Sequence, residues 1–409
     1  MPSVRDITID AFRLTTEQRT SGFYFTRNLI NALMETGRIG ELRLLLPRNS
    51  HSSLNELGVQ SSRGLRAIYP ERACYPEESF TEQVFWTQIV IPRLAQTTNS
   101  DDLLILPYHH TPLRFRALGT VVTVIHDTCG ITRLFPKSKK GYYQHLWMLW
   151  TAARAAEVLV PISGYTRATF LRNFAPSRGL VTERVWNCTD GNSISDCEGS
   201  AKLSLLKIQP YRYFFAIGAP GLRKGFDRCA EAFAAYTARG GQLDLVVMTS
   251  SASADAVQST LTEAGPNLRC QIVLDLPDEV RDALYWGAVA FLFPSRCEGF
   301  GYPVVEAMRQ GCPAIVPTAG PFREILGLGP PDNDDSEWDS NSVLEQMFEL
   351  DKLTPERRRE IALNLKRRSP VFSSNGYGDR FLKAVEDALV QRGDVAGRLV
   401  QDPCRGTDV

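Results

Sequence analysis

FPSRCEGFGYPVVEAM, residues 293–308, is the stretch of sequence that decides the fold of this chain. We expect a buried strand to end at Phe293 and a glycine-rich loop to follow. A helix should begin near Pro303, because the fixed φ of proline suits the first helical turn. A strand, loop and helix in this order gather unpaired backbone N–H groups and the positive end of the helix dipole at one point. Gly299 and Gly301 let the backbone approach a ligand closely, so the stretch predicts a phosphate-binding turn.

Two carboxylates frame this turn. Glu298 precedes the glycines and could reach a sugar hydroxyl or a developing positive charge. Glu306 lies within the first turns of the expected helix and could hold a ribose through its two oxygens. A phosphate site flanked by carboxylates fits a nucleotide sugar. The alternative is an ordinary turn between strand and helix whose glutamates are solvated, and the spacing alone leaves it open.

A second turn, FAIGAPGLRKGFD at residues 215–227, repeats the order of strand, loop and helix and carries two adjacent cations. Arg223 can bind phosphate oxygens as a fork and Lys224 can supply a point charge, so together they would stabilise a departing diphosphate. Gly218 lies where the strand turns. The glycine spacing fits neither the GxGxxG dinucleotide motif nor the GxxxxGK[ST] phosphate loop. On its own, the segment is equally compatible with a solvated surface turn.

Short β-branched runs alternate with longer segments of helical period through most of the chain. This pattern predicts an α/β fold built from parallel βαβ units. We expect helices over residues 22–35, 142–156 and 377–390. The expected strands cover residues 7–12, 42–46, 103–106, 121–125, 158–161, 213–217, 243–248, 271–274, 290–293 and 314–316.

With 409 residues, the chain is long enough for two domains. Residues 190–202 are rich in Gly, Ser and Asp and poor in large apolar residues, so we interpret them as a linker. The expected N-terminal domain covers residues 1–195, and the expected C-terminal domain covers residues 205–375. A helix over residues 377–391 is expected to pack back on the first domain, and residues 392–409 are expected to form a loose tail.

The composition argues against several classes of protein. The 46 basic and 46 acidic residues give a formal net charge of zero, so no global field draws the chain to nucleic acid. The nine cysteines form no CxxC pair, which argues against a zinc site and a disulfide framework, and we expect them to be reduced. The polar N-terminus lacks a signal-peptide core, and no apolar run reaches the roughly 20 residues that span a bilayer. We therefore expect a cytoplasmic protein, with peripheral contact to the inner face of the membrane left open.

The two turns resemble those of retaining glycosyltransferase family 4, whose GT-B fold has two Rossmann-like, doubly wound domains facing across a cleft. Glu298 and Glu306 match the family's E-x7-E signature, and Arg223-Lys224 matches its phosphate-binding pair. Three segments of the first half are similar to further family motifs: Thr20–Tyr24 to a glycine-rich first loop, Val124–Asp127 to a strand-ending His-Asp, and Pro161–Arg167 to a Ser-x-Tyr-[ST]-Arg segment. The resemblance spans roughly residues 7–390.

The resemblance implies a role for each matching residue. It implies Glu298 near the transferred sugar and Glu306 on the ribose of a nucleotide-sugar donor. The other implied contacts are the N–H groups of Gly299, Phe300 and Gly301 on sugar hydroxyls, the N–H of Val304 on phosphate, Gly22 on the diphosphate and His126 beside the sugar. Gly218 and Leu274 are assigned to the same donor site. The expected catalytic set is Glu298, His126, Arg223 and Lys224.

The sequence predicts the nucleotide-sugar donor less precisely than it predicts the fold. Leu274-Asp275-Leu276 lacks the glycine commonly found in the family's loop near the nucleobase, so the base stays open. VFWTQ at residues 84–88, with Pro92, Pro107-Tyr108 and His126-Asp127, most resembles bacterial polysaccharide mannosyltransferases. GDP-mannose is therefore the first expectation for the donor and a UDP-sugar the second.

The expected function is transfer of a hexose, with retention of configuration, to a hydroxyl of a glycan, glycolipid or other acceptor in bacterial surface polysaccharide synthesis. Closure around the donor would exclude water, which would otherwise hydrolyse the activated sugar. Two alternatives stay open. One is a GT-B epimerase or phosphorylase, and the other is a catalytically silent, carbohydrate-binding relative. The sequence does not predict the acceptor, the linkage or the oligomeric state.

Three further features have weaker support. Asp332-Asn333-Asp334 spells the metal-binding DxD pattern but falls in an acidic loop, so we expect no metal cofactor. Residues 137–150 mix basic and aromatic side chains and fit either a membrane-surface contact or a buried helix with a basic lead-in. His109 and His110 could line an acceptor cleft or lie in a plain loop.

Overall fold

A computed structural model describes most of the chain. The described residues are 5–15, 21–47, 54, 58–59, 64–70, 79–95, 102–113, 119–131, 139–177, 179–189, 191–330 and 338–393. The chain divides into two compact units, which are treated separately below. Unit 1 comprises residues 1–188 and 374–409, and unit 2 comprises residues 189–373.

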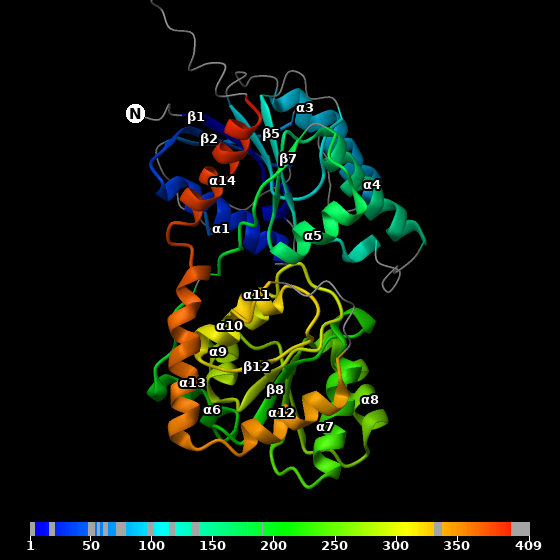
Figure 1. Cartoon of the computed structure of the whole chain (residues 1–409), viewed down its shortest axis with the longest axis vertical. Helices are drawn as coiled ribbons and strands as arrows, with labels where there is room; N and C mark the ends of the chain where they lie inside the picture. Colours follow the sequence, from blue (N-terminus) through cyan, green and yellow to red (C-terminus); the bar gives the residue numbers. More distant parts are fainter. Residues whose placement is uncertain are drawn as a thin grey trace, which may run out of the picture. The chain divides into compact units, whose positions relative to one another are not determined.

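Unit 1 is built on a seven-stranded parallel sheet with the order β3-β2-β1-β4-β5-β6-β7 (Figure 1). The predictions for β4 and β6 are confirmed to the residue, and those for β1, β2 and β5 within a few residues. β3 and β7 were not predicted, because they are short edge strands without a continuous apolar run. The strands are β1 (Arg5–Asp10), β2 (Ile39–Leu45), β3 (Leu65–Ile68), β4 (Leu103–Leu106), β5 (Thr120–Ile125), β6 (Val158–Pro161) and β7 (Leu180–Val181).

Helices of unit 1 pack around this sheet. Their bounds are α1 (Ser21–Glu35), α2 (Phe80–Phe85), α3 (Ile91–Leu94), α4 (Lys139–Ala155), α5 (Gly164–Asn173) and α14 (Tyr377–Gln391), with a π-helical turn η2 (Trp86–Val90) between α2 and α3 and 3-10 turns η1 (Phe12–Thr15) and η4 (Cys129–Ile131). The C-terminal helix α14 packs on α1 (Figure 1). Gly378 allows this close approach, since a Cβ there would lie 2.1 Å from the carbonyl oxygen of Ala32. The chain therefore returns to its first unit at the end.

Unit 2 has a five-stranded parallel sheet with the order β10-β9-β8-β11-β12. Its strands are β8 (Tyr213–Ile217), β9 (Asp244–Thr249), β10 (Cys270–Leu274), β11 (Ala290–Leu292) and β12 (Ala314–Ile315). Its helices are α6 (Asp196–Leu205), α7 (Phe226–Ala238), α8 (Ala254–Ala264), α9 (Asp278–Gly287), α10 (Tyr302–Gln310), α11 (Phe322–Leu326), α12 (Ser340–Asp351) and α13 (Pro355–Arg368), with 3-10 turns η5 (Leu222–Lys224), η6 (Ser251–Ser253) and η7 (Ser369–Phe372). All five predicted strands of this half are confirmed, that of β8 to the residue.

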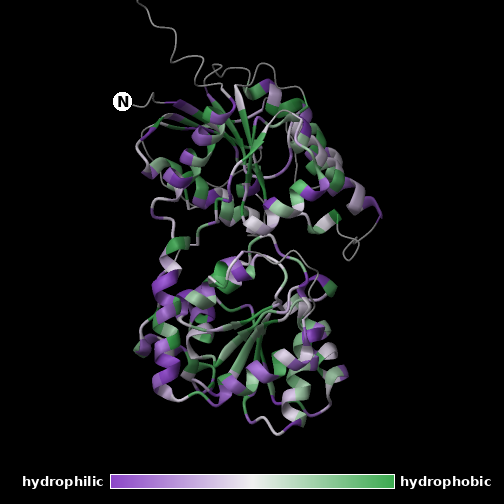
Figure 2. Ribbon diagram, in the orientation of Figure 1, coloured by the Kyte–Doolittle hydropathy of each residue, from purple (hydrophilic) through white to green (hydrophobic). Residues whose placement is uncertain are grey.

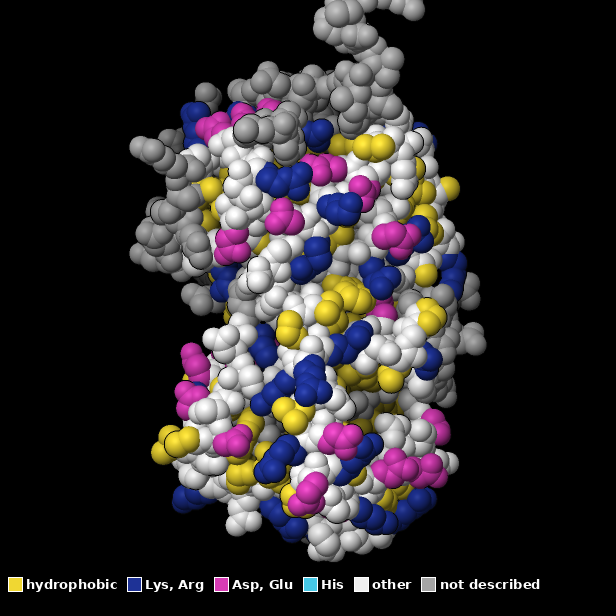
Figure 3. Space-filling model, turned by 60° about the vertical axis from the view of Figure 1, so that its left-hand side comes forward, with side chains coloured by type: hydrophobic (Ala, Val, Ile, Leu, Met, Phe, Trp, Pro, Cys, Tyr) yellow, Lys and Arg dark blue, Asp and Glu magenta, His cyan; other side chains and the backbone are white. Residues whose placement is uncertain are grey.

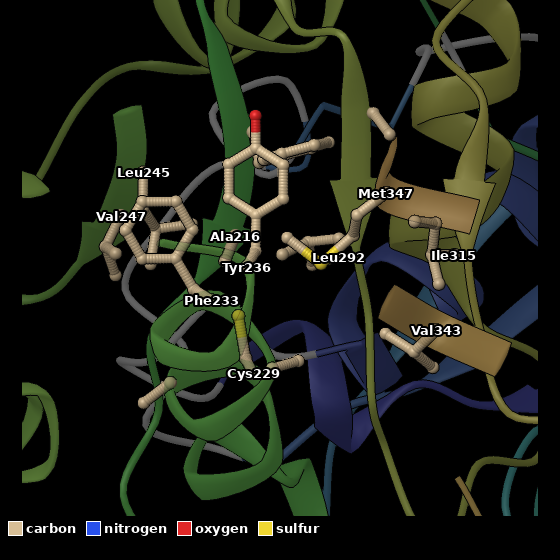
Figure 4. Close-up of a cluster of buried hydrophobic side chains, with 14 of the residues drawn as sticks. Ala216, Cys229, Phe233, Tyr236, Leu245, Val247, Leu292, Ile315, Val343 and Met347 are labelled. Atoms are coloured by element: carbon tan, nitrogen blue, oxygen red, sulfur yellow. The ribbon is translucent and has the colours of Figure 1, made fainter. Parts of the chain in front are cut away.

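The strands and the inward faces of the helices make the cores. Figure 2 shows green strands flanked by helices that mix purple and green. In unit 2, Phe233 and Tyr236 of α7 pack with Leu292 of β11 and with Met347 of α12 (Figure 4). Burying side chains of this size stabilises the unit by about 1.5–3 kcal/mol each, so the sheet is a rigid platform for the loops at its edge.

The predicted linker at residues 190–202 is wrong for its second half. Residues 196–202 belong to α6, which packs against α9 in unit 2. Ser195 and Glu198 form a capping box that fixes the start of this helix, and Asp196 accepts a 3.0 Å hydrogen bond from the Trp286 indole. The boundary between the units consequently falls at residue 188 rather than near residues 195–205.

The structure also bears on three expectations from the composition, which concern surface charge, membrane-spanning segments and cysteines. Lys, Arg, Asp and Glu side chains are interspersed over the visible face in Figure 3. No helix in the described part of the chain combines the length and the apolar character needed to cross a bilayer. Cys188, Cys197, Cys229, Cys270 and Cys312 are free thiols. The expectation of reduced cysteines is wrong for Cys129 and Cys297, which are disulfide-bonded.

Candidate functional site

The two quoted turns meet at the carboxyl edge of the second sheet. They follow β8 and β11, the neighbouring strands at which the strand order reverses, and ligands of open parallel sheets bind at such a switch point. The backbone N–H of Arg296 donates a 2.9 Å hydrogen bond to the carbonyl of Arg223, which ties the turns together. Gly225 has a φ of +68°, and a Cβ there would lie 2.1 Å from the carbonyl oxygen of Pro294. Only glycine fits this junction without displacing the backbone.

Arg223, Lys224 and Glu298 form one cluster at this junction. The Lys224 ammonium lies 2.7 Å from a Glu298 carboxylate oxygen, and the Arg223 guanidinium lies 3.5 Å from the same oxygen. The Ser295 hydroxyl donates a further 2.8 Å hydrogen bond to that oxygen, and Arg223 donates one of 3.2 Å to the Cys297 carbonyl. The sequence did not single out Ser295, although its position three residues before Glu298 fits a local hydrogen bond.

The charges of the cluster are unevenly exposed. Burial acts to raise the pKa of Glu298, but the charges of Lys224 and Arg223 and the hydrogen bonds from Lys224 and Ser295 outweigh it and hold that pKa below its usual value. Glu298 exposes 12% of its side chain, whereas Arg223 exposes 42% and Lys224 33%. The cluster can therefore offer two cations to an anionic ligand in solution while one ionised carboxylate stays in place beneath them.

The glycine-rich loop leads directly into α10. Gly301 has a φ of +98° and is the residue before the helix, and a Cβ there would lie 2.9 Å from the ring of Phe322. The N–H of Val304, assigned by the resemblance to phosphate, donates a 3.0 Å bond to the Gly301 carbonyl inside the first turn. A ligand at this position would share that N–H or displace the carbonyl. Phe300 is buried and contacts the rings of Tyr302 and Phe372.

Glu306 has contacts different from those of the cluster. Its two carboxylate oxygens face α9, where the Tyr285 hydroxyl donates a bond of 3.3 Å and the Arg281 guanidinium lies 3.5 Å away. Burial raises the pKa of Glu306. The two glutamates thus lie in the same unit on either side of one loop, with opposite pKa shifts. Sequence reasoning missed Arg281 and Tyr285, whose helical spacing of four residues places them on one face of α9.

Gly218 and Leu274 do not join the cluster of charges. The N–H of Gly218 donates to the Met248 carbonyl and its carbonyl accepts from the Thr249 hydroxyl, so the backbone of Gly218 is bonded into the sheet. Leu274 ends β10 and exposes 43% of its surface. The following residue, Asp275, adopts a φ of +47° and accepts a 3.1 Å bond from the Ser251 N–H. An aspartate tolerates this left-handed conformation, which explains how the loop dispenses with glycine.

In unit 1, Gly22 and His126 lie near the switch point of the first sheet, between β1 and β4. Gly22 is the second residue of α1, and a Cβ there would lie 3.0 Å from the ring of Tyr108. The imidazole Nε2 of His126 lies 2.6 Å from the Pro107 carbonyl oxygen, which can only accept, so Nε2 carries the proton. Tyr108 stacks on His126 at 4.6 Å and Phe25 meets it edge-on at 4.5 Å. Burial lowers the pKa of His126 to about 4, so the ring is neutral near pH 7. Thr20, the first residue of the loop motif, lies outside the described residues.

His109 and His110 are buried beside this ring stack. Burial lowers the pKa of His110 to about 3 and that of His109 well below its ordinary value. Asp10, at the end of β1, was missed in the sequence. Its carboxylate accepts a 2.9 Å hydrogen bond from the Trp86 indole, and burial raises its pKa to about 7. A polar residue directly after an apolar run was the available signal.

The two remaining sequence features are the metal-binding DxD pattern and the basic, aromatic segment at residues 137–150. Among the described residues, no three or more His, Cys, Asp or Glu side chains are grouped in a way that could hold a metal ion. Asp332-Asn333-Asp334 lies outside the described residues. Helix α4 has a buried face and an aromatic surface, because Leu149 is buried while Tyr143 exposes 65% and Trp150 44% of its surface.

Solved structures with this arrangement define the class of the fold. The chain is similar to a sucrose-phosphate synthase from Thermosynechococcus elongatus, with a TM-score of 0.69 and 16% identity over 95% of this chain and 100% of the other. It is also similar to HepE from Anabaena in complex with UDP and glucose, with a TM-score of 0.62 and 14% identity over 94% and 100% of the two chains. The chain has the GT-B fold, as predicted.

The particular family is indicated by the second unit. Residues 202–331 match the family described as Glycosyl transferases group 1, and both turns of the site lie within the match. Among curated proteins, an O-antigen chain mannosyltransferase B of Escherichia coli is 26% identical over 215 residues. That alignment covers 51% of this chain and 56% of the relative, so the chain spans little more than half of the length of that relative.

Proposed function

We propose that this chain is a retaining glycosyltransferase that transfers a hexose from a nucleotide diphosphate sugar to a hydroxyl of a glycan, glycolipid or other acceptor. One observation carries the proposal. Arg223 and Lys224 are held against Glu298 at the switch point of the second sheet and remain partly exposed. Two fixed cations at this place suit a diphosphate, whose negative charge grows as the glycosidic bond breaks.

GDP-mannose is our first proposal for the donor and a UDP-sugar the second. The similarity to an O-antigen chain mannosyltransferase supports mannose, and synthesis of a bacterial surface polysaccharide would be the matching process. The UDP in the similar HepE structure supports the second choice. We propose that the protein acts in the cytoplasm or at the inner face of the membrane and needs no metal, with Arg223 and Lys224 as the cations beside the diphosphate.

The residues would divide the work as follows. Arg223 and Lys224 bind the diphosphate, Glu298 orients the sugar, and Glu306 holds the ribose. Glu298 and Glu306 would not form an acid and base couple of the glycosidase kind. The departing phosphate would instead help to deprotonate the acceptor hydroxyl on the same face of the sugar. His126, neutral and with its proton on Nε2, could serve beside the sugar only through hydrogen bonds.

A thermal-shift screen against GDP-, UDP- and ADP-sugars tests this proposal. A donor present at 100 times its Kd stabilises the native state by about 2.7 kcal/mol, so the true donor should give the largest rise in Tm. NMR of the product, with a panel of glycan acceptors, should show the donor's anomeric configuration. Release of nucleoside diphosphate should depend on acceptor, which distinguishes transfer from epimerase activity. No shift with any nucleotide sugar would contradict the proposal.

A further inference from the structure

Two side chains of helix α9 contact the two carboxylate oxygens of Glu306. The Tyr285 hydroxyl donates to Oε2 at 3.3 Å, and Nη2 of Arg281 lies 3.5 Å from Oε1. Arg281 is itself oriented, because its Nη1 lies 3.0 Å from a carboxylate oxygen of Asp278 one turn earlier on the helix. These contacts run from α9 to α10 within unit 2.

We propose that Arg281 is a positioning residue, which holds the carboxylate of Glu306 in the orientation that receives the ribose of the donor. The inference rests on the proposed function, because that function gives Glu306 its ligand. Neither the sequence motifs nor the family match assigns a role to Arg281. Arg281 acts through Glu306 and need not touch the donor.

The charges around Glu306 explain why a cation is needed there. Burial raises the pKa of Glu306, and the nearby carboxylates of Asp282 and Asp278 raise it further. Arg281 is the strongest opposing influence and Arg309, on α10 itself, is the next. Without Arg281, two acidic neighbours would face the buried carboxylate with one cation left. Glu306 would then take up a proton at higher pH and lose acceptor capacity for hydroxyl donors.

A contribution to the stability of the fold does not by itself explain why Glu306 and Arg281 are paired here. Glu306 exposes 16% of its side chain and Arg281 20%, so both charges are largely withdrawn from water. The cost of desolvating such a pair commonly equals or exceeds its mutual attraction. An apolar pair could pack α9 on α10 equally well, whereas only an ionised carboxylate in a fixed orientation can accept two hydroxyl donors from a ribose.

The test is a double-mutant cycle with nucleotide binding as the readout. Calorimetry with GDP and UDP would compare the wild type with Arg281→Gln, Arg281→Lys, Glu306→Gln and the Arg281→Gln/Glu306→Gln double variant. We expect Arg281→Gln to weaken binding about tenfold at pH 7, which lies within the range for coupled neighbours. The loss should grow as the pH falls, because protonation of Glu306 then sets in earlier. Arg281→Lys should restore most of the affinity.

The double variant gives the decisive comparison. If Arg281 acts through Glu306, Arg281→Gln should add little to Glu306→Gln. In turnover, Arg281→Gln should raise the donor KM more than it lowers kcat. Arg357→Gln on α13 is the matched control, because it removes an exposed arginine that pairs with Glu360 in the same unit.

The possible failures are separable. A wild-type protein that binds neither nucleotide would contradict the proposed function itself. A wild-type protein that binds, together with unchanged binding by Arg281→Gln or an equal loss in the Glu306→Gln background, would overturn the inference alone. Should Arg281→Gln fail to fold, Arg281→Met, which retains the packing of the aliphatic stem, replaces it in the same cycle and carries the same expectations.

Discussion

At the carboxyl edge of the second sheet two cations surround one ionised carboxylate, whereas at the same edge of the first sheet the histidines are neutral and buried. Arg223 and Lys224 expose 42% and 33% of their side chains beside Glu298. His110 and His126 are almost fully buried, and burial lowers the pKa of His110 to about 3 and that of His126 to about 4.

The two edges share their topology, since the strand order reverses between β1 and β4 in one sheet and between β8 and β11 in the other. The topology therefore provides a place for a ligand in each unit, and the residues that follow the strands determine the charge of that place. A charged edge suits a diphosphate. At the edge of the first sheet the histidines are neutral, and the Arg13 guanidinium lies 4.5 Å from the centre of the Tyr108 ring that stacks on His126.

The largest expected effect is on the charged edge. Lys224→Ala should lower kcat by about 10²- to 10³-fold, the range seen when one electrostatic donor to a developing negative charge is removed. The measurement is steady-state transfer with the donor found in the thermal-shift screen. Lys352→Ala, which removes a lysine beside Phe348 in the same unit, is the control and should leave kcat unchanged. Equal kcat values for Lys224→Ala and the wild type would show that the charged edge of the second sheet has no special role compared with the edge of the first sheet.

A second effect concerns the junction that holds the charged edge together. Gly225→Ala should destabilise the protein by about 3 kcal/mol, because the new Cβ would overlap the Pro294 carbonyl oxygen and φ is +68°. Gly240→Ala, just after the end of α7 in the same unit, is the matched control, because Gly240 has a φ of +87° and open space around its Cβ, so it should cost only the backbone strain of about 1 kcal/mol. Urea unfolding measures both. Equal losses would show that the contact with Pro294 contributes nothing.

The smallest effect concerns the carboxyl edge of the first sheet. Burial raises the pKa of Asp10 to about 7, so its contribution to stability is complete at acid pH and is lost as the pH rises through 7. Asp10→Asn keeps an acceptor for the Trp86 indole but does not ionise. At pH 8 it should be more stable than the wild type, and this advantage should shrink by about 2–3 kcal/mol toward pH 5, since each pH unit between the two pKa values changes the free energy of unfolding by about 1.4 kcal/mol. Chemical unfolding at several pH values measures this, and a parallel pH dependence in both proteins would contradict it.

Much of the fold could be predicted because its strands are continuous apolar runs. β4, β6 and β8 were found to the residue, since each is an uninterrupted apolar or β-branched segment buried on both faces. The edge strands β3 and β7 were missed because an edge strand needs no such run. Helix α6 was missed because its polar composition outweighed the capping box formed by Ser195 and Glu198.

The candidate site was predictable only where one segment contains the signal. The turns around Arg223 and Glu298 were each visible as a strand, glycines and charge, and parallel pairing of β8 with β11 brings them together. The partner of Glu306 was not visible, because Arg281 lies 25 residues earlier on another helix and forms no motif with it. Neutral histidines were equally hidden, since protonation depends on burial rather than on sequence.

Calorimetric titration of GDP and UDP into the wild type and the Arg223→Ala/Lys224→Ala variant tests the central claim most directly. The claim is that this pair of cations receives the diphosphate. We predict that the wild type binds one of the two nucleotides and that the double variant loses at least about tenfold in affinity, since each hydrogen bond to a charged group contributes about 1.5–3 kcal/mol. Equal affinity of the two proteins would contradict the account.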